Sequence, residues 1–131
     1  MTGRSAYLRF VLLEQNEQSH RRTGLLVAAH ALRDSDELDG TEFEQVRALC
    51  AWFNKNVNVP KVLRADDNER ALSWFKADAT KPIAKMWELA AFFEARDRPI
   101  EVLRTDDPGI ILFEDGWQVV AKPGRGRRVS W

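Results

Sequence analysis

The stretch 99–123 constrains the fold of this chain more than any other, because two turn signals divide it into three apolar segments. The run DDPG at 106–109 places proline and glycine where a type I or type II turn requires them, and DG at 115–116 suits a two-residue type I′ hairpin. The segments between them are rich in β-branched and aromatic residues, which favour strands. The pattern predicts a three-stranded meander, with strands at 100–105, 110–114 and 117–121.

A three-stranded sheet needs an apolar layer against one face, and the segment 82–96 offers one. Pro82 suits the first turn of a helix. Apolar residues then cover most of the helix circumference, among them Met86, Leu89 and Phe93. Because this helix ends shortly before the meander begins, we expect it to pack directly on those strands.

Hydrophobic spacing predicts three further elements. Apolar residues occupy both faces of 7–13, which indicates a central strand. Leu25, Ala28 and Leu32 recur at helical spacing and predict a helix over 24–33. The segment 61–76 fits strand or helix, and we favour a strand at 71–76.

The clearest helix start in the chain is a capping box. Thr41 is the expected N-cap, and Glu44 is expected to reach back from the third helical position. An apolar stripe follows over about four turns, and the proline at position 60 ends it. We therefore expect a helix over 41–57.

These elements predict an α+β fold in two layers. One layer is a mixed or antiparallel sheet that includes the C-terminal meander, and about three helices cover it. We expect residues 1–131 to form a single domain, in which 122–131 is a mobile basic tail.

Composition excludes several classes of protein. The chain has 131 residues, 44 % of them hydrophobic, which is incompatible with disorder. It has 20 basic and 20 acidic residues, so its net charge gives no argument for nucleic acid or an anionic membrane as partner. No apolar run approaches the roughly 20 residues of a membrane span, and the N-terminal run lacks the features of a signal peptide. The single cysteine, Cys50, suits a reducing compartment, so we expect a cytoplasmic protein.

Few residues offer recognisable chemistry. His20 and His30 are the only histidines, and neither has the spacing of a metal site. Cys50 lies among apolar neighbours and is expected to be a core residue. The aspartate pairs at 66–67 and 106–107 could act as general acid and base if they met in a cleft, although turns also favour aspartate at such positions. No cofactor or metal is predicted.

Basic residues near aromatic residues form the remaining candidate site. They could follow a phosphate backbone while a ring stacks on a base, although nearby acids cancel part of their charge. The candidate nucleic-acid-binding residues are Arg21, Arg22, Arg64, Arg70, Trp74, Lys76, Arg125, Arg127 and Arg128.

The sequence is compatible with three functions. The first is a non-enzymatic protein-interaction or self-associating module, because the apolar strand 7–13 and helix 82–96, with Trp117 and Trp131, carry more hydrophobic surface than a thin domain easily buries. Its partner is the chain itself or another protein. The alternatives are a nucleic-acid-binding accessory protein and a small enzyme with paired aspartates.

Overall fold

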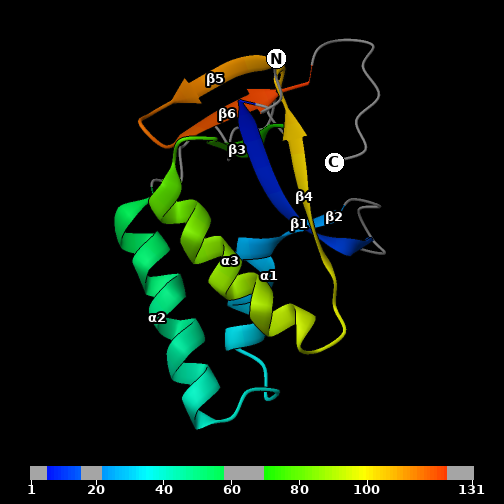
Figure 1. Ribbon diagram of the computed structural model, residues 1–131, viewed down its shortest axis with the longest axis vertical. Helices are drawn as coiled ribbons and strands as arrows, with labels where there is room; N and C mark the ends of the chain where they lie inside the picture. The colour runs from blue at the N-terminus through cyan, green and yellow to red at the C-terminus, as the bar shows by residue number, and fades with distance from the viewer. Residues whose placement is uncertain (1–5, 16–21, 58–69, 124–131) are drawn as a thin grey trace.

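The protein has the predicted α+β architecture, with a six-stranded antiparallel sheet in one layer and three helices in the other (Figure 1). The computed structural model describes residues 6–15, 22–57 and 70–123. The elements, in chain order, are β1 (Tyr7–Gln15), β2 (Arg22–Gly24), α1 (Leu25–Arg33), α2 (Gly40–Asn56), β3 (Leu72–Lys76), α3 (Thr80–Glu94), β4 (Ile100–Thr105), β5 (Ile110–Glu114) and β6 (Gln118–Lys122). None of these helices is long and apolar enough to cross a membrane.

Strand β1 lies at the centre of the sheet and pairs with three other strands. On one edge it pairs with β4 over six residues, from Tyr7 opposite Thr105 to Leu12 opposite Ile100. On its other edge, β3 pairs with the beginning of β1 and β2 pairs with its second half. The central strand predicted at 7–13 is therefore confirmed, whereas the three-residue strand β2 was not predicted.

The three C-terminal strands form where the sequence predicts them. They do not all pair with their neighbours in the chain, however, as the strands of a simple meander do. Strands β5 and β6 form a hairpin, and β6 pairs on its other edge with β3. Strand β4 pairs with β1 instead of β5. Burial of β1 favours this arrangement, because pairing on both edges satisfies the N–H and C=O groups of a strand that is largely inaccessible to water.

The turn between β5 and β6 differs from the predicted type I′ hairpin. A type I′ turn needs positive φ at both central residues, and among the described residues only Asp97 and Gly109 have positive φ. Instead, the Asp115 amide donates to the Gln118 carbonyl at 2.9 Å, and the Asp115 carboxylate accepts from the amides of Trp117 and Gln118. The aspartate side chain thus closes a longer turn, and the last strand begins at Gln118.

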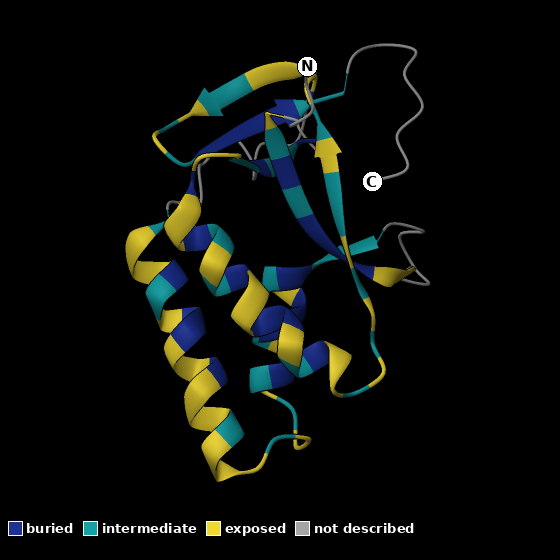
Figure 2. Cartoon of the chain, viewed as in Figure 1, coloured by how far each residue is buried: buried dark blue, intermediate teal, exposed yellow. Residues whose placement is uncertain are grey.

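Helix α1 packs on β1, α3 packs on β4, and α2 packs on these two helices, while the outer faces of the helices remain exposed (Figure 2). Helix α3 covers β4 as expected, since Ile100 and Val102 pack on the core cluster to which its Met86 and Phe93 belong. The Trp117 side chain does not belong to a surplus of exposed apolar surface, because its ring stacks on that of Trp52 in α2, with the two ring centroids 5.8 Å apart. This contact joins the β5–β6 hairpin to the helical layer.

Helix α2 begins two residues earlier than predicted. Its N-cap is Asp39, whose carboxylate accepts the Glu42 amide at 2.8 Å, while the Glu42 carboxylate accepts the Asp39 amide at 3.2 Å. The prediction of a capping box at Thr41 and Glu44 is wrong. Glu42 also forms an ion pair with Arg96 at 2.9 Å, a tertiary contact that favours the earlier start.

Replacing Gly109 with alanine will destabilise the protein by roughly 2 kcal/mol or more, because its φ of 109° is strained for other residues and the new Cβ would lie 2.2 Å from the Lys122 carbonyl oxygen. Gly116→Ala is the matched control, since no atom lies within 4 Å of its Cβ position. Urea unfolding of both variants checks the prediction. Equal stability losses would contradict it.

Replacing Asp39 with alanine will lower the free energy of unfolding by about 1 kcal/mol, because the Glu42 amide in the first turn of α2 loses its carboxylate partner. Thr41→Ala, in the first turn of the same helix, will change it by less than about 0.5 kcal/mol. Thermal and urea unfolding measure both. A larger loss in the Thr41 variant would restore the original N-cap prediction.

Candidate functional site

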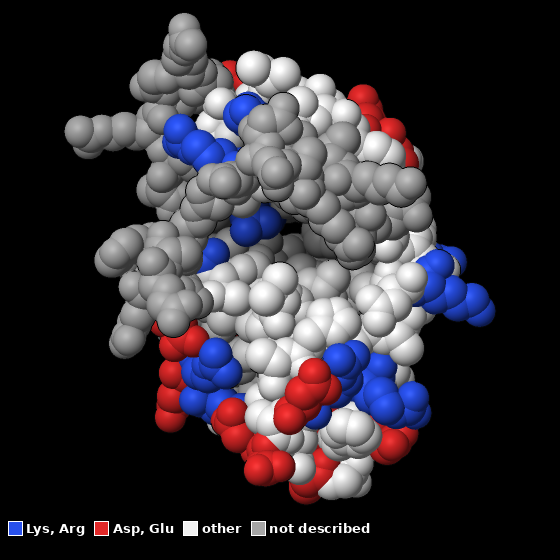
Figure 3. Space-filling view, turned by 180° about the vertical axis from the view of Figure 1, so that it is seen from behind, with Lys and Arg blue, Asp and Glu red and all other residues white. Residues whose placement is uncertain are grey.

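A cavity of about 370 Å³ lies where β3 and β2 separate along one edge of β1. β3 pairs with Tyr7 and Leu8, and β2 pairs with Val11 and Gln15, so Arg9 and Phe10 lie between the two pairings on that edge. Helix α1 and the end of α2 close the space from the helical layer. Figure 3 shows that the rear face of the molecule is hollowed and that basic side-chain atoms lie in the hollow.

Most of the cavity wall is apolar. Phe53, with a side chain only 1 % exposed, lies 6.4 Å from the Phe75 ring, and Met86 is 3 % exposed. The described apolar side chains that line the cavity are Phe10, Leu25, Leu26, Val27, Phe53, Val57, Ala71, Leu72, Phe75 and Met86. Such a wall favours an apolar ligand or side chain over water.

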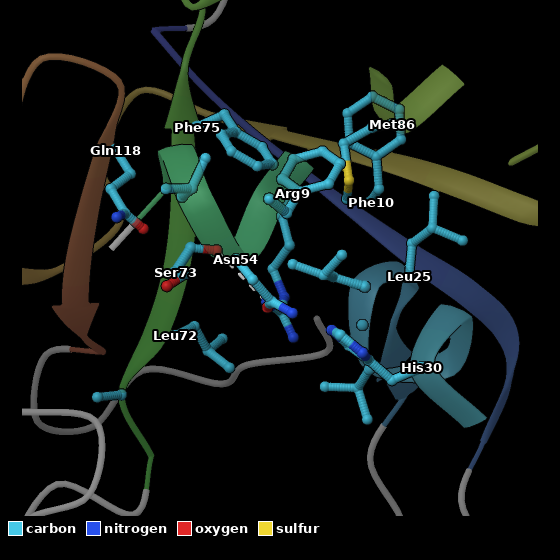
Figure 4. Close-up of a pocket in the computed structure, with 16 residues that line it drawn as sticks. Arg9, Phe10, Leu25, His30, Asn54, Leu72, Ser73, Phe75, Met86 and Gln118 are labelled. Carbon is cyan, nitrogen blue, oxygen red and sulfur yellow. Dashed lines mark hydrogen bonds between the residues drawn. The ribbon is translucent and has the colours of Figure 1, made fainter. Parts of the chain in front are cut away.

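Arg9 supplies positive charge at this wall. Its guanidinium donates through Nη1 to the Ser73 carbonyl oxygen at 3.3 Å, which bridges β1 and β3 where their pairing stops. Figure 4 shows the Arg9 side chain extending into the space between the strands, with Asn54 and His30 nearby. Ser73 and Gln118 are the other polar lining residues. The arrangement combines an apolar interior with one cationic group.

His30 is partly buried in α1, and burial lowers its pKa. The nearby charge of Arg33 lowers the pKa further, and the Asp34 carboxylate opposes both effects. The imidazole is therefore neutral at pH 7, and one ring nitrogen donates while the other accepts. It adds hydrogen-bonding capacity to the cavity without adding charge.

No local sequence pattern indicates this cavity. Its residues range from Arg9 to Gln118, so no local motif contains them. The one available signal was a charged residue in the middle of the otherwise apolar strand around Arg9. A charge in such a strand is expensive to bury and is placed either at an ion pair or at a cavity.

The predicted nucleic-acid-binding residues do not form a basic surface among the described residues. Arg22 pairs with Glu101 and donates to the Leu12 carbonyl oxygen at 3.3 Å. Lys76 pairs with Glu114 at 2.7 Å, and this contact raises the pKa of Lys76. Arg70 is exposed. The other basic candidates, Arg21, Arg64, Arg125, Arg127 and Arg128, lie outside the described residues.

Trp74 does not offer a stacking platform. It is the central residue of β3, opposite Val119 of β6, and only 1 % of it is exposed. A ring must present a face to solvent to stack on a base. The assignment of Trp74 to a nucleic-acid surface is therefore wrong, whereas nucleic-acid binding by the remaining residues stays a prediction.

The described aspartates of the pair 106–107 accept backbone amides. Asp106 accepts the amide of Ala6, which precedes β1, at 2.8 Å, and Asp107 accepts the Gly109 amide of its own turn at 3.1 Å. The other pair, at 66–67, lies outside the described residues. Cys50 is fully buried, and burial raises the pKa of its thiol, as expected for a core cysteine. Within the described ranges, no cluster of His, Cys, Asp or Glu could hold a metal ion.

Strand β5 carries two consecutive exposed apolar residues. Ile110 is 61 % exposed and Ile111 is 44 % exposed. Among the described strands β5 pairs only with β6, so its second edge is open. An open edge with apolar side chains is a surface that natural sheets usually protect.

Comparison of the chain with protein-family models found no matching model, and comparisons with curated proteins and with solved structures found no match either. The geometry of the described residues therefore carries the functional inference.

Lowering the pH from about 7.5 to about 5.5 will reduce the free energy of unfolding in part through His30. The pKa of His30 is below its ordinary 6.5 in the folded protein, so the unfolded chain binds the proton more readily in this range and stability falls as pH falls. Urea unfolding at several pH values will show that the free energy of unfolding falls less with pH in the His30→Gln variant than in the original chain. Parallel declines would contradict the prediction.

Proposed function

We propose that the protein is a non-enzymatic protein-interaction module, in which an extended segment of a partner protein pairs with the open edge of β5. The observation that carries this proposal is the joint exposure of Ile110 and Ile111 on an edge strand. Adding a strand to such an edge supplies main-chain hydrogen bonds, while apolar side chains of the added strand cover those of β5.

The exposure of two consecutive residues of β5 supports the addition of a partner strand at this edge. Neighbouring side chains in a strand point to opposite faces of the sheet. Ile110 and Ile111 are therefore exposed on both faces, so a partner strand gains apolar contacts above and below the sheet. Single exposed apolar residues are common on protein surfaces, but two together at an edge are not.

Charge at the ends of β5 indicates what kind of segment would bind. Asp106 and Asp107 precede the strand and are exposed, whereas Glu114, its last residue, pairs with Lys76 and has about half of its side chain exposed. An apolar segment flanked by lysine or arginine residues would complement these acids.

The same charges favour a different protein over a second copy of this chain. Antiparallel pairing of two β5 strands would bring Glu114 of each copy towards Asp107 of the other. Like charges at opposing positions destabilise a strand pair. The partner we propose is therefore a different chain with basic residues around a short β-forming segment.

The described aspartates support the non-enzymatic part of the proposal, because Asp106 accepts the amide of Ala6, just before β1, and Asp107 accepts the Gly109 amide in the turn before β5. We also propose a cytoplasmic location, since a free, buried thiol at Cys50 suits a reducing compartment.

A synthetic peptide of alternating valine and threonine, with two lysines at each end, will bind to β5. We expect chemical-shift changes in NMR spectra at Ile110 to Glu114. The peptide will bind more weakly at about 500 mM salt than at about 50 mM, because salt screens the attraction between exposed charges. Ile111→Lys will weaken binding about tenfold, because it removes an apolar contact and repels the lysines.

Leu13→Lys is the matched control, because Leu13 is 53 % exposed and lies on β1 instead of β5. It will bind the peptide normally. A peptide with glutamates in place of the lysines will bind weakly. Light scattering will show a monomer. The proposal would be refuted by a dimer that Ile111→Lys dissociates, or by equal binding of the two peptides.

A further inference from the structure

The cavity beside β1 is a second surface that the proposed function does not use. Strand β5 contributes no residue to its described lining, so a ligand there is independent of strand pairing at the sheet edge. We infer that this cavity binds a neutral small molecule that carries one hydroxyl group on a hydrocarbon body, with the body on the apolar wall and the hydroxyl hydrogen-bonded to His30.

The size and lining of the cavity fit the hydrocarbon body. A volume of about 370 Å³ lies within the range of roughly 300–1,000 Å³ that small-molecule sites occupy. The rings of Phe53 and Phe75 and the thioether of Met86 line it, and the flexible methionine adapts to ligands of different shape. Each methylene group that enters such a space raises the affinity about fourfold.

His30 supplies the polar contact. It lines the cavity and is partly buried, and Figure 4 shows its imidazole at the edge of the space between the strands. Within the described part of the chain, neither ring nitrogen of His30 takes part in a hydrogen bond. A polar group that is partly shielded from water and has no partner is destabilised, and a ligand that hydrogen-bonds to it removes this cost.

A hydroxyl group matches this imidazole. Burial lowers the pKa of His30, so the ring is neutral at pH 7 and presents one donor and one acceptor. A hydroxyl also both donates and accepts, so it can bond to either ring nitrogen. The side-chain amide of Asn54, an exposed lining residue, has both roles too and forms no hydrogen bond within the described ranges.

The charged groups of the cavity disfavour ionised ligands. Arg9 is already engaged within the protein, and its guanidinium donates to the Ser73 carbonyl oxygen, so a ligand carboxylate would have to compete with these contacts. The described lining contains no Asp or Glu, so a ligand ammonium group would have no counter-charge. Moving an ionised group into an apolar space without a partner is costly. A neutral hydroxyl is therefore the preferred polar end.

Titration with 1-octanol and four related compounds separates the contributions of chain, hydroxyl and charge. Calorimetry will show that 1-octanol binds about fivefold more tightly than its isomer 1-methoxyheptane, which cannot donate a hydrogen bond. 1-Hexanol will bind about fourfold more weakly than 1-octanol for each missing methylene group. Octanoate and octylamine will each bind at least about tenfold more weakly than 1-octanol.

NMR spectra locate the bound alcohol. Chemical-shift changes with 1-octanol will map to the cavity, at Gly24, Ser73 and the His30 ring. The inference would be overturned by the absence of 1-octanol binding, by shifts confined to β5, or by an octanoate affinity equal to that of 1-octanol.

Two variants of His30 test the hydroxyl contact. His30→Leu removes the donor and the acceptor, so it will lower 1-octanol affinity about fivefold while leaving 1-methoxyheptane binding nearly unchanged. His30→Gln keeps a donor and an acceptor and will retain most of the preference for the alcohol over the ether. A merely structural role of His30 would change both affinities together. If His30→Leu kept the full preference for 1-octanol, the contact would be refuted.

A second pair of variants tests the site itself at exposed positions, where folding is least affected. Asn54→Trp, in the cavity lining, will lower 1-octanol affinity at least about tenfold, because the larger side chain obstructs the space. Lys55→Trp, also exposed but outside the lining, will leave the affinity unchanged. Equal binding of 1-octanol by these two variants would refute the site.

Failure of this site and failure of the proposed function are distinguishable. Ile111→Lys changes β5 alone and will leave 1-octanol affinity unchanged, since Ile111 is not among the lining residues. Asn54→Trp will leave binding of the lysine-flanked peptide unchanged. A variant that removed both activities would show that the cavity and the edge are one site, and would overturn their separation.

Discussion

The pairing of β1 with three strands is the constraint on which the rest of the structure depends. Phe10 and Leu12 enter the helical core from one face of the strand, and Val11 is fully buried on the other. The backbone N–H and C=O groups of a buried strand need partners on both edges, and β4 fills one edge with a continuous ladder. The other edge is shared by β3 and β2, which part at Arg9, and the resulting opening is the cavity.

The remaining polar residues largely serve this scaffold. The carboxylates of Asp107 and Asp115 accept backbone amides in the turns around β5, and that of Asp106 accepts the Ala6 amide just before β1. The Trp52–Trp117 stack holds the end of the hairpin against α2. Two surfaces are left for partners, namely the charged, apolar cavity within the sheet and the exposed isoleucines at its edge. They differ in chemistry, since the cavity is lined mostly by apolar side chains and the edge of β5 offers main-chain hydrogen bonds.

Local pattern predicted the elements well and their partners poorly. Alternation and helical spacing located β1, α1, β3, α3 and the last three strands, because those signals lie within each segment. The start of α2 was wrong because both Asp39–Glu42 and Thr41–Glu44 match a capping box, and the ion pair with Arg96, distant in sequence, favours the first. The pairing of β4 with β1, the burial of Trp74 and the assembly of the cavity all depend on contacts between distant segments, which a single sequence does not display.

Amide hydrogen exchange tests the central role of β1 most directly. If β1 organises the fold, the amides of its paired residues exchange only when the whole protein unfolds, so their free energies of opening equal the global free energy of unfolding measured with urea. Alternate amides of β5 point away from β6 and exchange much faster, through local opening or directly. Exchange of the β1 amides as fast as those of β5, at opening free energies well below the global value, would contradict this account.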